Sequence, residues 1–145
     1  LKLYLFMKIV NLNFSVNTIS KSLNDITNEV YDYVHKSKIT NGLCTLFIKH
    51  TSASLVIQEN ADPAVLRDIE SFFTKLVSED TKLYEHNYEG SDDMPAHIRS
   101  LLTNTNLSIP IINSKLDLGT WQGIYLYEHR SHSHKRQVTI NIFGK

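Results

Sequence analysis

The sequence predicts one compact α+β domain, with about three helices and an antiparallel-rich mixed sheet. The chain has 145 residues, of which 41% are hydrophobic, and this is enough for one core without disulfides or a structural metal. Apolar residues recur at strand spacing in about six or seven short segments and at helical spacing in about three. Short turns join most of these segments, and no repeat or low-complexity linker divides the chain. Together these observations favour a single domain of the α+β class.

The first part of the chain alternates strand and helix signals. Residues 8–14 alternate apolar and polar side chains, as a strand with one buried face does. An apolar run at helical spacing follows and predicts an amphipathic helix, with Thr18 or Ser20 as its cap. This run comprises Ile19, Leu23, Ile26, Val30 and Val34. Residues 43–48 and 54–57 are then expected to form two buried strands.

The second half of the chain predicts two more helices and then only strands. Asp62 and Pro63 suit the cap and first position of a helix, and a third, shorter helix is expected from Asp93, with Pro95 in its first turn, to Leu102. The expected inner face of the second helix comprises Val65, Ile69, Phe72, Phe73 and Leu76. The expected later strands are 107–112, 116–118, 121–128 and 137–143.

Composition limits the partners that the protein can have. The formal net charge is zero, so no overall field attracts nucleic acid or an anionic membrane, and we expect neither as a partner. The single cysteine, Cys44, cannot form an internal disulfide, which predicts a reducing compartment and a cytoplasmic location. We expect Met7 to be the native start, so that residues 1–6 are an N-terminal extension and residues 7–145 form the domain.

The segment from Tyr84 to His97 is the strongest functional signal. It holds two histidines and four carboxylates in fourteen residues, a density for which a surface loop has no structural need. Imidazole and carboxylate groups hold divalent metals or transfer protons near neutral pH. The segment is therefore predicted to be the centre of a site. A simpler alternative is a solvated turn in which Asp92 and Asp93 favour a helix N-terminus.

Other polar residues are expected at the ends of the predicted strands. His50 directly follows one buried strand and Glu59 follows the next, so the two could lie at neighbouring strand ends. His97 is placed in the first turn of the third helix. The imidazoles of His50, His86 and His97 could then meet as the three ligands of a catalytic zinc or similar ion. For His50 alone, a hydrogen-bonded structural role is the alternative.

Two later segments each allow two interpretations. The run from Gly119 to Gly123 is either a tight turn with a core tryptophan or a place where Gln122 points into a pocket. Residues 129–136 are either an exposed hairpin loop or a cationic loop suited to phosphate oxygens, and Arg136, at the head of a strand, is the better anchor of the two arginines in it.

Five ordered motifs resemble those of the YjbQ family, an uncharacterised protein family also labelled secondary thiamine-phosphate synthase. The motifs are Lys49–Leu55, Glu59-Asn60 with Asp62-Pro63, Tyr84–His97, Gly119–Gly123 and Glu128-His129-Arg130, and the likeness extends from Met7 to Gly144. The resemblance implies a compact α+β protein that forms a homotrimer, with the histidine and acidic motifs in a pocket near the subunit interface. Asn87 stands where relatives often carry aspartate, which lowers the local negative charge.

The resemblance and the residue chemistry together give the expected site. Expected catalytic residues are His50, Glu59, His86, Asp93 and His97. Expected substrate-binding residues are Thr51, Ser52, Asn60, Tyr88, Trp121, Gln122 and Arg136. The expected divalent metal, magnesium or zinc, has His50, His86 and His97 as ligands, or alternatively Glu89, Asp92 and Asp93.

The predicted function is that of a secondary thiamine-phosphate synthase, and two alternatives accompany it. The resemblance implies that hydroxymethylpyrimidine diphosphate is joined to thiazole phosphate with release of pyrophosphate, which needs a cation for the diphosphate and an aromatic wall for the pyrimidine. The histidines suit a metal-dependent hydrolase that activates water better than they suit magnesium–diphosphate chemistry. The third possibility is a non-catalytic binder of a small phosphorylated metabolite.

Overall fold

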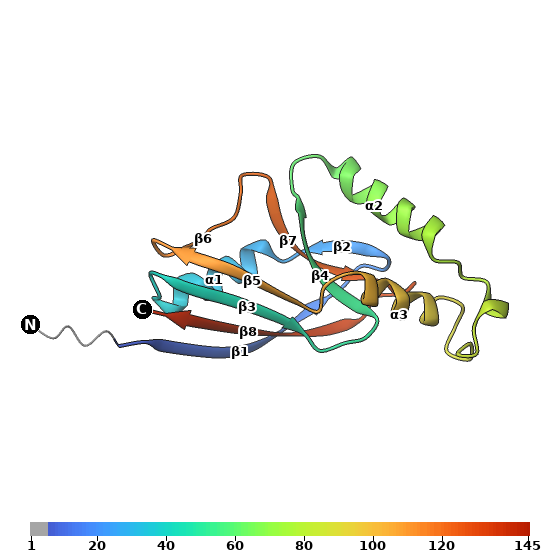
Figure 1. Cartoon of the computed structure of the whole chain (residues 1–145), viewed down its shortest axis with the longest axis horizontal. Coiled ribbons are helices and arrows are strands. Elements are labelled where there is room, and N and C mark those ends of the chain that lie inside the picture. The colour runs from blue at the N-terminus through green and yellow to red at the C-terminus, as the bar shows by residue number, and fades with distance from the viewer. Residues whose placement is uncertain (1–5) are drawn as a thin grey trace, which may run out of the picture.

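The computed structural model describes residues 6–145, which form a single α+β domain of three α-helices and eight strands (Figure 1). The elements in chain order are β1 (Lys8–Asn17), β2 (Ser22–Asp25), α1 (Thr27–Ser37), β3 (Gly42–Ile48), β4 (Ala53–Glu59), α2 (Pro63–Leu76), the short 3-10 helix η1 (Thr81–Leu83), α3 (Asp93–Leu102), β5 (Asn106–Ile112), β6 (Lys115–Leu116), β7 (Gln122–Glu128) and β8 (Lys135–Gly144). The predicted class is confirmed.

The strands form two antiparallel sheets. One sheet has the order β1-β8-β3-β5-β6 and the other has the order β2-β7-β4. The consecutive strands β3 and β4 belong to different sheets, and residues 49–52 carry the chain from one to the other. Every strand pair in the described chain is antiparallel, which fits the expected antiparallel-rich sheet, but the sequence did not show that there are two sheets.

The core lies between helix α1 and the inward faces of the sheets. Val30 and Val34 of α1 are buried against inward residues such as Leu46 of β3 and Ile140 of β8. Burial and exposure alternate along β8, as expected for a strand with one face on the core. Each fully buried aliphatic side chain of this kind contributes roughly 1.5–3 kcal/mol to folding.

The first helix is shorter than the sequence predicted, and the expected caps Thr18 and Ser20 lie outside it. Helix α1 begins at Thr27, because residues 22–25 form β2 and pair with β7, with Leu23 opposite Tyr127. Lys21 has a φ of 40°, a left-handed conformation that a helix does not contain. Pairing with a distant strand thus overrode the helical spacing of the apolar residues before Ile26.

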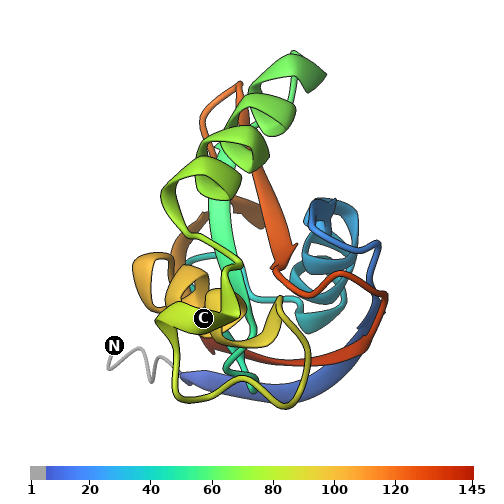
Figure 2. The same cartoon turned by 90° about the vertical axis from the view of Figure 1, so that its right-hand side faces the viewer.

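Helix α2 has the predicted start but not the predicted buried face. The carboxylate of Asp62 accepts a hydrogen bond from the Ala64 amide at 2.8 Å, and Pro63 is the first helical residue. No residue of Pro63–Leu76 is buried, however, and Phe72 is 59% exposed. In Figure 2 the helix extends beyond the rest of the fold. Among the expected inward residues, Val65, Ile69 and Phe73 are half-buried and Phe72 and Leu76 are exposed, so this face is only partly covered in the single chain.

Helix α3 and the later strands are confirmed with small shifts in their bounds. Helix α3 runs from Asp93 to Leu102, as predicted, but its cap position is Asp92, so His97 lies in the second turn rather than the first. Strand β8 is longer than predicted and starts at Lys135. Within the described residues, no helix is long and apolar enough to cross a membrane.

Candidate metal centre

Three predicted site residues come together at the start of α3. The ligand atoms of His86, Asp93 and His97 all lie within 4.8 Å of one another. Nε2 of His86 is 2.6 Å from Oδ2 of Asp93, and Nε2 of His97 is 3.5 Å from the same oxygen. Asp93 is buried, whereas both imidazoles are partly exposed. Two imidazoles and one carboxylate therefore surround one point that solvent can reach.

Local sequence explains this convergence. Asp93 and His97 are four residues apart, so they lie on the same face of α3. His86 comes from the preceding loop, which turns back at Gly90, and the amide of Asp93 donates to the Gly90 carbonyl at 3.3 Å. Gly90 has a φ of 110°, which side chains rarely tolerate, and a Cβ there would lie 2.8 Å from Oδ1 of Asp92. This turn brings the loop histidine to the helix.

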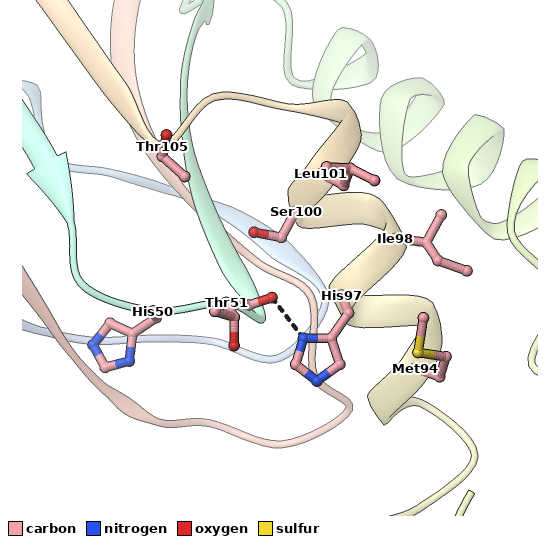
Figure 3. Close-up of a pocket in the computed structure, with 8 residues that line it drawn as sticks. All are labelled: His50, Thr51, Met94, His97, Ile98, Ser100, Leu101 and Thr105. Atoms are coloured by element: carbon pink, nitrogen blue, oxygen red, sulfur yellow. Dashed lines mark hydrogen bonds between the residues drawn. The ribbon is translucent and has the colours of Figure 1, made fainter. Parts of the chain in front are cut away.

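The orientation of His97 is fixed by the backbone. Its Nδ1 lies 3.0 Å from the carbonyl oxygen of Thr51, which can only accept, so Nδ1 carries the hydrogen (Figure 3). In the neutral ring Nε2 then has a lone pair directed toward Asp93. A histidine whose second nitrogen donates to a carbonyl is a frequent arrangement for metal ligands.

Arg130 contacts the cluster, although the sequence did not predict it as a site residue. Its Nη1 is 2.7 Å from Oδ1 of Asp93, and its Nε donates to Oδ2 of Asp92 at 2.9 Å. Its Nη2 also donates to the Glu89 carbonyl at 2.9 Å. The motif Glu128-His129-Arg130 was the available signal, but the sequence alone favoured Arg136 as the more important arginine.

These contacts decide the charge of the two aspartates. Burial raises the pKa of Asp93, but the hydrogen bond with His86 and the Arg130 charge outweigh it and lower the pKa overall. The pKa of Asp92 is also lowered, since hydrogen bonds from Arg130 and Ser131 outweigh its burial. Both carboxylates are therefore ionised at neutral pH and able to face a cation.

A cavity of about 330 Å³ adjoins this cluster (Figure 3). Met94, Ile98 and Leu101 of α3 give it an apolar wall, and the imidazole of His97 connects it to the cluster. Thr51, from the loop that joins the two sheets, also lines it. The cavity has room for the apolar part of a small molecule beside the histidines.

His50 lines the same cavity but does not join the cluster. In Figure 3 its ring lies on the other side of Thr51 and points away from His97. Its Nε2 accepts a hydrogen bond from the Gln137 amide at 2.8 Å, and burial together with the Arg136 charge lowers its pKa. The structure thus does not bring His50, His86 and His97 together, and Asp93 takes the place expected for His50.

A second group of expected residues lies at the far end of strands β4 and β7. Glu59 pairs with Gln122 at that end, whereas Ala53 pairs with Glu128 near the cluster. Strand β4 starts beside the loop of His50 and runs away from it, so Glu59 is separated from His50 by about 20 Å of strand. The expectation that these two lie at neighbouring strand ends is therefore wrong.

The residues beside Glu59 have mainly local contacts. The side chain of Gln122 accepts from the Gly119 amide at 2.7 Å, which is the tight-turn alternative of the sequence analysis. Trp121 is 63% exposed and is not a core tryptophan. The backbone N–H of Asn60 donates to the Trp121 backbone carbonyl at 3.0 Å. Within one chain, none of these residues contributes to the cluster.

Arg136 and Ser52 belong to a buried network. Nε of Arg136 donates to Oε2 of Glu128 at 2.7 Å, and its Nη2 donates to Oγ of Ser52 at 3.1 Å. Both charged side chains are buried, and the Arg136 hydrogen bond helps lower the Glu128 pKa against the raising effect of burial. Arg136 is therefore enclosed in an internal ion pair, and it does not face the cavity as a phosphate anchor would.

Two exposed side chains complete the surroundings of the cluster. The ring of Tyr88 is 80% exposed and lies edge-on to His86, with ring centroids 5.8 Å apart. The carboxylate of Glu89 is 3.9 Å from Nε2 of His86 and is open to solvent. Both side chains are therefore accessible to solvent beside His86.

Known proteins with similar sequences share nearly the whole chain. A sequence model described as UPF0047 protein YjbQ-like matches residues 12–145. A UPF0047 protein of Synechocystis is 52% identical over 130 residues, covering 90% of this chain and 88% of that protein. The UPF0047 protein YjbQ of Salmonella typhimurium is 45% identical over 121 residues, covering 83% of this chain and 87% of the relative.

Solved structures show the same fold. A YbjQ-like protein of unknown function from Sulfolobus solfataricus has a TM-score of 0.87 and 29% identity, covering 97% of this chain and 100% of that chain. An uncharacterised conserved protein of the YjbQ/UPF0047 family from Clostridium acetobutylicum has a TM-score of 0.82 and 38% identity, covering 90% and 98%. The family match, the high identities and the shared fold all agree, and the chain therefore belongs to the YjbQ/UPF0047 family.

Proposed function

We propose that this protein is a divalent-metal-dependent enzyme that activates water at His86, Asp93 and His97. The observation that carries the proposal is the convergence of two imidazole nitrogens and one ionised carboxylate oxygen within 4.8 Å, beside a cavity. Three protein ligands that leave other positions open are the usual arrangement of a catalytic zinc site, and related sets hold iron or manganese.

The surrounding residues suit such an ion. The Thr51 carbonyl fixes the tautomer of His97 so that Nε2 is available, and Arg130 neutralises Oδ1 of Asp93 and leaves Oδ2 for the ion. A bound divalent ion would lower the pKa of a coordinated water and supply a nucleophile near neutral pH. The proposed ligand set differs from the predicted set of His50, His86 and His97 by one residue.

The cavity supports a small substrate with an apolar part. Met94, Ile98 and Leu101 would contact that part, while His97 lies where the reactive end would be. Arg130 and Arg136 are both engaged by carboxylates, so neither offers a free guanidinium to a phosphate. A phosphorylated substrate would therefore depend on the ion itself for charge neutralisation.

Thiamine-phosphate synthesis, which the family resemblance implied, is the second candidate. The exposed ring of Tyr88 beside His86 favours it, because a pyrimidine could stack there. The enclosed Arg136 and the distant Trp121 count against it, since these were the expected phosphate and stacking partners. Non-catalytic binding of a phosphorylated metabolite would use the same cavity without turnover.

We also propose the homotrimer that the resemblance implied. The exposed side chains of Phe72 and Leu76 on α2 support self-association, because a second copy of the chain could cover them. Sedimentation of the purified protein measures this directly. A monomer at micromolar concentration would contradict it.

One experiment tests the proposed function. Untagged protein purified without chelator is analysed for bound metal and assayed against ester and phosphate-ester substrates and the two thiamine precursors. We expect about one transition metal per chain, and loss of both metal and hydrolysis in His97→Ala. His35→Ala, at an exposed position on α1, is the matched control and should keep both.

Each contrary result has a distinct meaning. Full hydrolytic activity in metal-free protein would contradict the metal-dependent mechanism. Thiamine phosphate formed in the mixed-substrate assay, without hydrolysis of the other substrates, would favour the second candidate. Saturable stabilisation by a phosphorylated compound without any product would identify a binding protein.

A further inference from the structure

Arg130 connects three separate parts of the candidate metal centre. Its guanidinium contacts Asp93, a proposed ligand, Asp92, at the cap of α3, and the backbone carbonyl of Glu89, in the loop that carries His86. The three contacts are 2.7, 2.9 and 2.9 Å long and use all three guanidinium nitrogens. Only 12% of the Arg130 side chain is exposed. This side chain is therefore held in one orientation by the groups around it.

The two oxygens of the Asp93 carboxylate have different partners. Oδ1 is bound by Arg130 at 2.7 Å, whereas Oδ2 lies 2.6 Å from His86 and 3.5 Å from His97. A charge-assisted contact of this length restricts rotation of the carboxylate. Asp93 can then offer only one oxygen to an ion between the two imidazoles.

The backbone at Arg130 and the next residue is also held by hydrogen bonds. The Arg130 backbone amide donates to Oε1 of Glu128 at 3.1 Å, and Glu128 is buried with Arg136. Its neighbour Ser131 donates its amide to Oδ2 of Asp92 at 2.8 Å, so the same segment contacts the cap of α3 twice. The segment that follows β7 is thus tied to the start of α3 through the contacts of Arg130 and Ser131 with the buried Asp92.

We infer that Arg130 is a positioning residue of the metal centre. It turns Asp93 so that Oδ2 alone faces the two histidines, and it keeps the His86 loop against α3. This inference rests on the proposed metal site and adds a residue whose side chain touches neither ion nor substrate. Its consequence is a one-oxygen carboxylate ligand, which leaves more coordination positions for water and substrate.

Cobalt binding tests the inference, because the visible absorption of Co²⁺ reports coordination number as well as affinity. Arg130→Gln removes the charge and frees Oδ1 of Asp93. We expect Co²⁺ affinity to fall by about 10–100-fold, the usual effect of losing a residue that orients a ligand. At saturating Co²⁺ we also expect a changed absorption spectrum, since Asp93 can then bind through both oxygens.

Two further variants give the test its controls. Arg67→Gln makes the same chemical change on the exposed surface of α2 and should match wild type in affinity and spectrum. Arg130→Lys keeps a positive charge but not the planar fork, so it should retain the fold and still show the altered spectrum. If Arg130→Gln does not fold, the comparison of Arg130→Lys with wild type decides by the same two readouts.

The outcomes separate this inference from the proposed function. Wild-type protein that binds Co²⁺, together with an Arg130→Gln variant of equal affinity and identical spectrum, would overturn the positioning role and leave the metal site intact. Wild-type protein that binds neither Co²⁺ nor Zn²⁺ would overturn the metal site itself. Weaker binding with a changed spectrum in the Arg130 variants alone is the result that we expect.

Discussion

Asp93 and His97 lie one turn apart on α3, and the distance between Oδ2 of Asp93 and Nε2 of His97 is 3.5 Å. The spacing is set by the helix, so the pair is held by backbone hydrogen bonds and not by a flexible loop. His86 approaches the same oxygen from the loop before the helix. One half of the proposed metal centre is therefore rigid, and the other depends on loop structure.

This arrangement makes Asp93→Asn a direct test of the carboxylate. The amide is nearly the same size but carries no charge, so we expect divalent-metal affinity to fall by more than about tenfold and metal-dependent activity to fall with it. Isothermal titration with Zn²⁺ measures the change. Asp68→Asn, at an exposed position on α2, is the control and should bind as wild type does.

Helix α2 is held to the body by a charged contact, and Glu70→Ala should loosen it. Glu70 receives two hydrogen bonds from the buried Arg99 at 3.0 and 3.1 Å, and the Tyr127 hydroxyl donates to it at 2.7 Å. Its loss leaves the Arg99 charge unpaired, so we expect the free energy of unfolding to fall by about 2–3 kcal/mol.

Urea denaturation measures the Glu70 effect, and Glu79→Ala provides the control. Glu79 pairs with Lys21 near the surface, where such pairs contribute only about 0–1 kcal/mol. Equal losses of stability in the two variants would show that the buried position of Arg99 is unimportant.

The buried ring of His129 predicts how stability depends on pH. Burial and the nearby Arg99 charge lower its pKa to about 3, so the folded protein keeps the ring neutral while the unfolded chain binds a proton near pH 6.5. The free energy of unfolding is therefore not reduced by His129 above about pH 6.5, and it falls as the pH drops from 6.5 toward 3. The slope for this one proton reaches about 1.4 kcal/mol per pH unit near pH 5 and is only a fraction of that value at pH 7.

Urea denaturation between pH 7 and pH 5 checks this slope, above the range in which most carboxylates titrate. In His129→Gln, the free energy of unfolding should change less steeply with pH, by the amount that one proton contributes. His50, whose pKa is also lowered, adds to the slope in the same direction and remains in this variant. An unchanged slope in His129→Gln would show that the ring is not kept neutral by burial.

Cys44 should be unreactive in the native protein. It is fully buried in β3, and burial raises its thiol pKa to about 12, so almost no thiolate forms at neutral pH. We expect no reaction with a thiol reagent at pH 8 within the time that fully labels the urea-unfolded chain. Rapid labelling under native conditions would indicate frequent local opening of the five-stranded sheet.

Local signals explain why parts of the fold could be predicted. The start of α2 follows from Asp62 and Pro63, and the bounds of α3 follow from its acidic start and apolar spacing. These signals act over a few residues, so the sequence displays them directly. Strand β2 was missed because its four residues are defined by pairing with β7, about a hundred positions later.

The candidate site also has residues that local sequence predicted and residues that it did not. Asp93 and His97 were predictable as a pair, and His86 as part of the same dense segment. The hydrogen-bonded role of His50 was one of two alternatives that the sequence offered, but its partner, Gln137, could not be identified from the sequence. The enclosure of Arg136 was not predictable, since it depends on hydrogen bonds to residues such as Glu128 and Ser52. Trp121 and Glu59 were placed at the far end of β4 by the direction of a strand that the sequence had located correctly.

By itself, the sequence determined the α+β class, most of the element bounds and the segment that carries the site. Only the tertiary structure decided which side chains meet there, and above all that Arg130, 37 positions after Asp93, reaches it to hold one of its oxygens. The physical reason is the distance along the chain over which each kind of interaction acts. Periodicity, caps and turns arise from neighbours along the chain, whereas charges that meet in space depend on how two sheets and three helices pack.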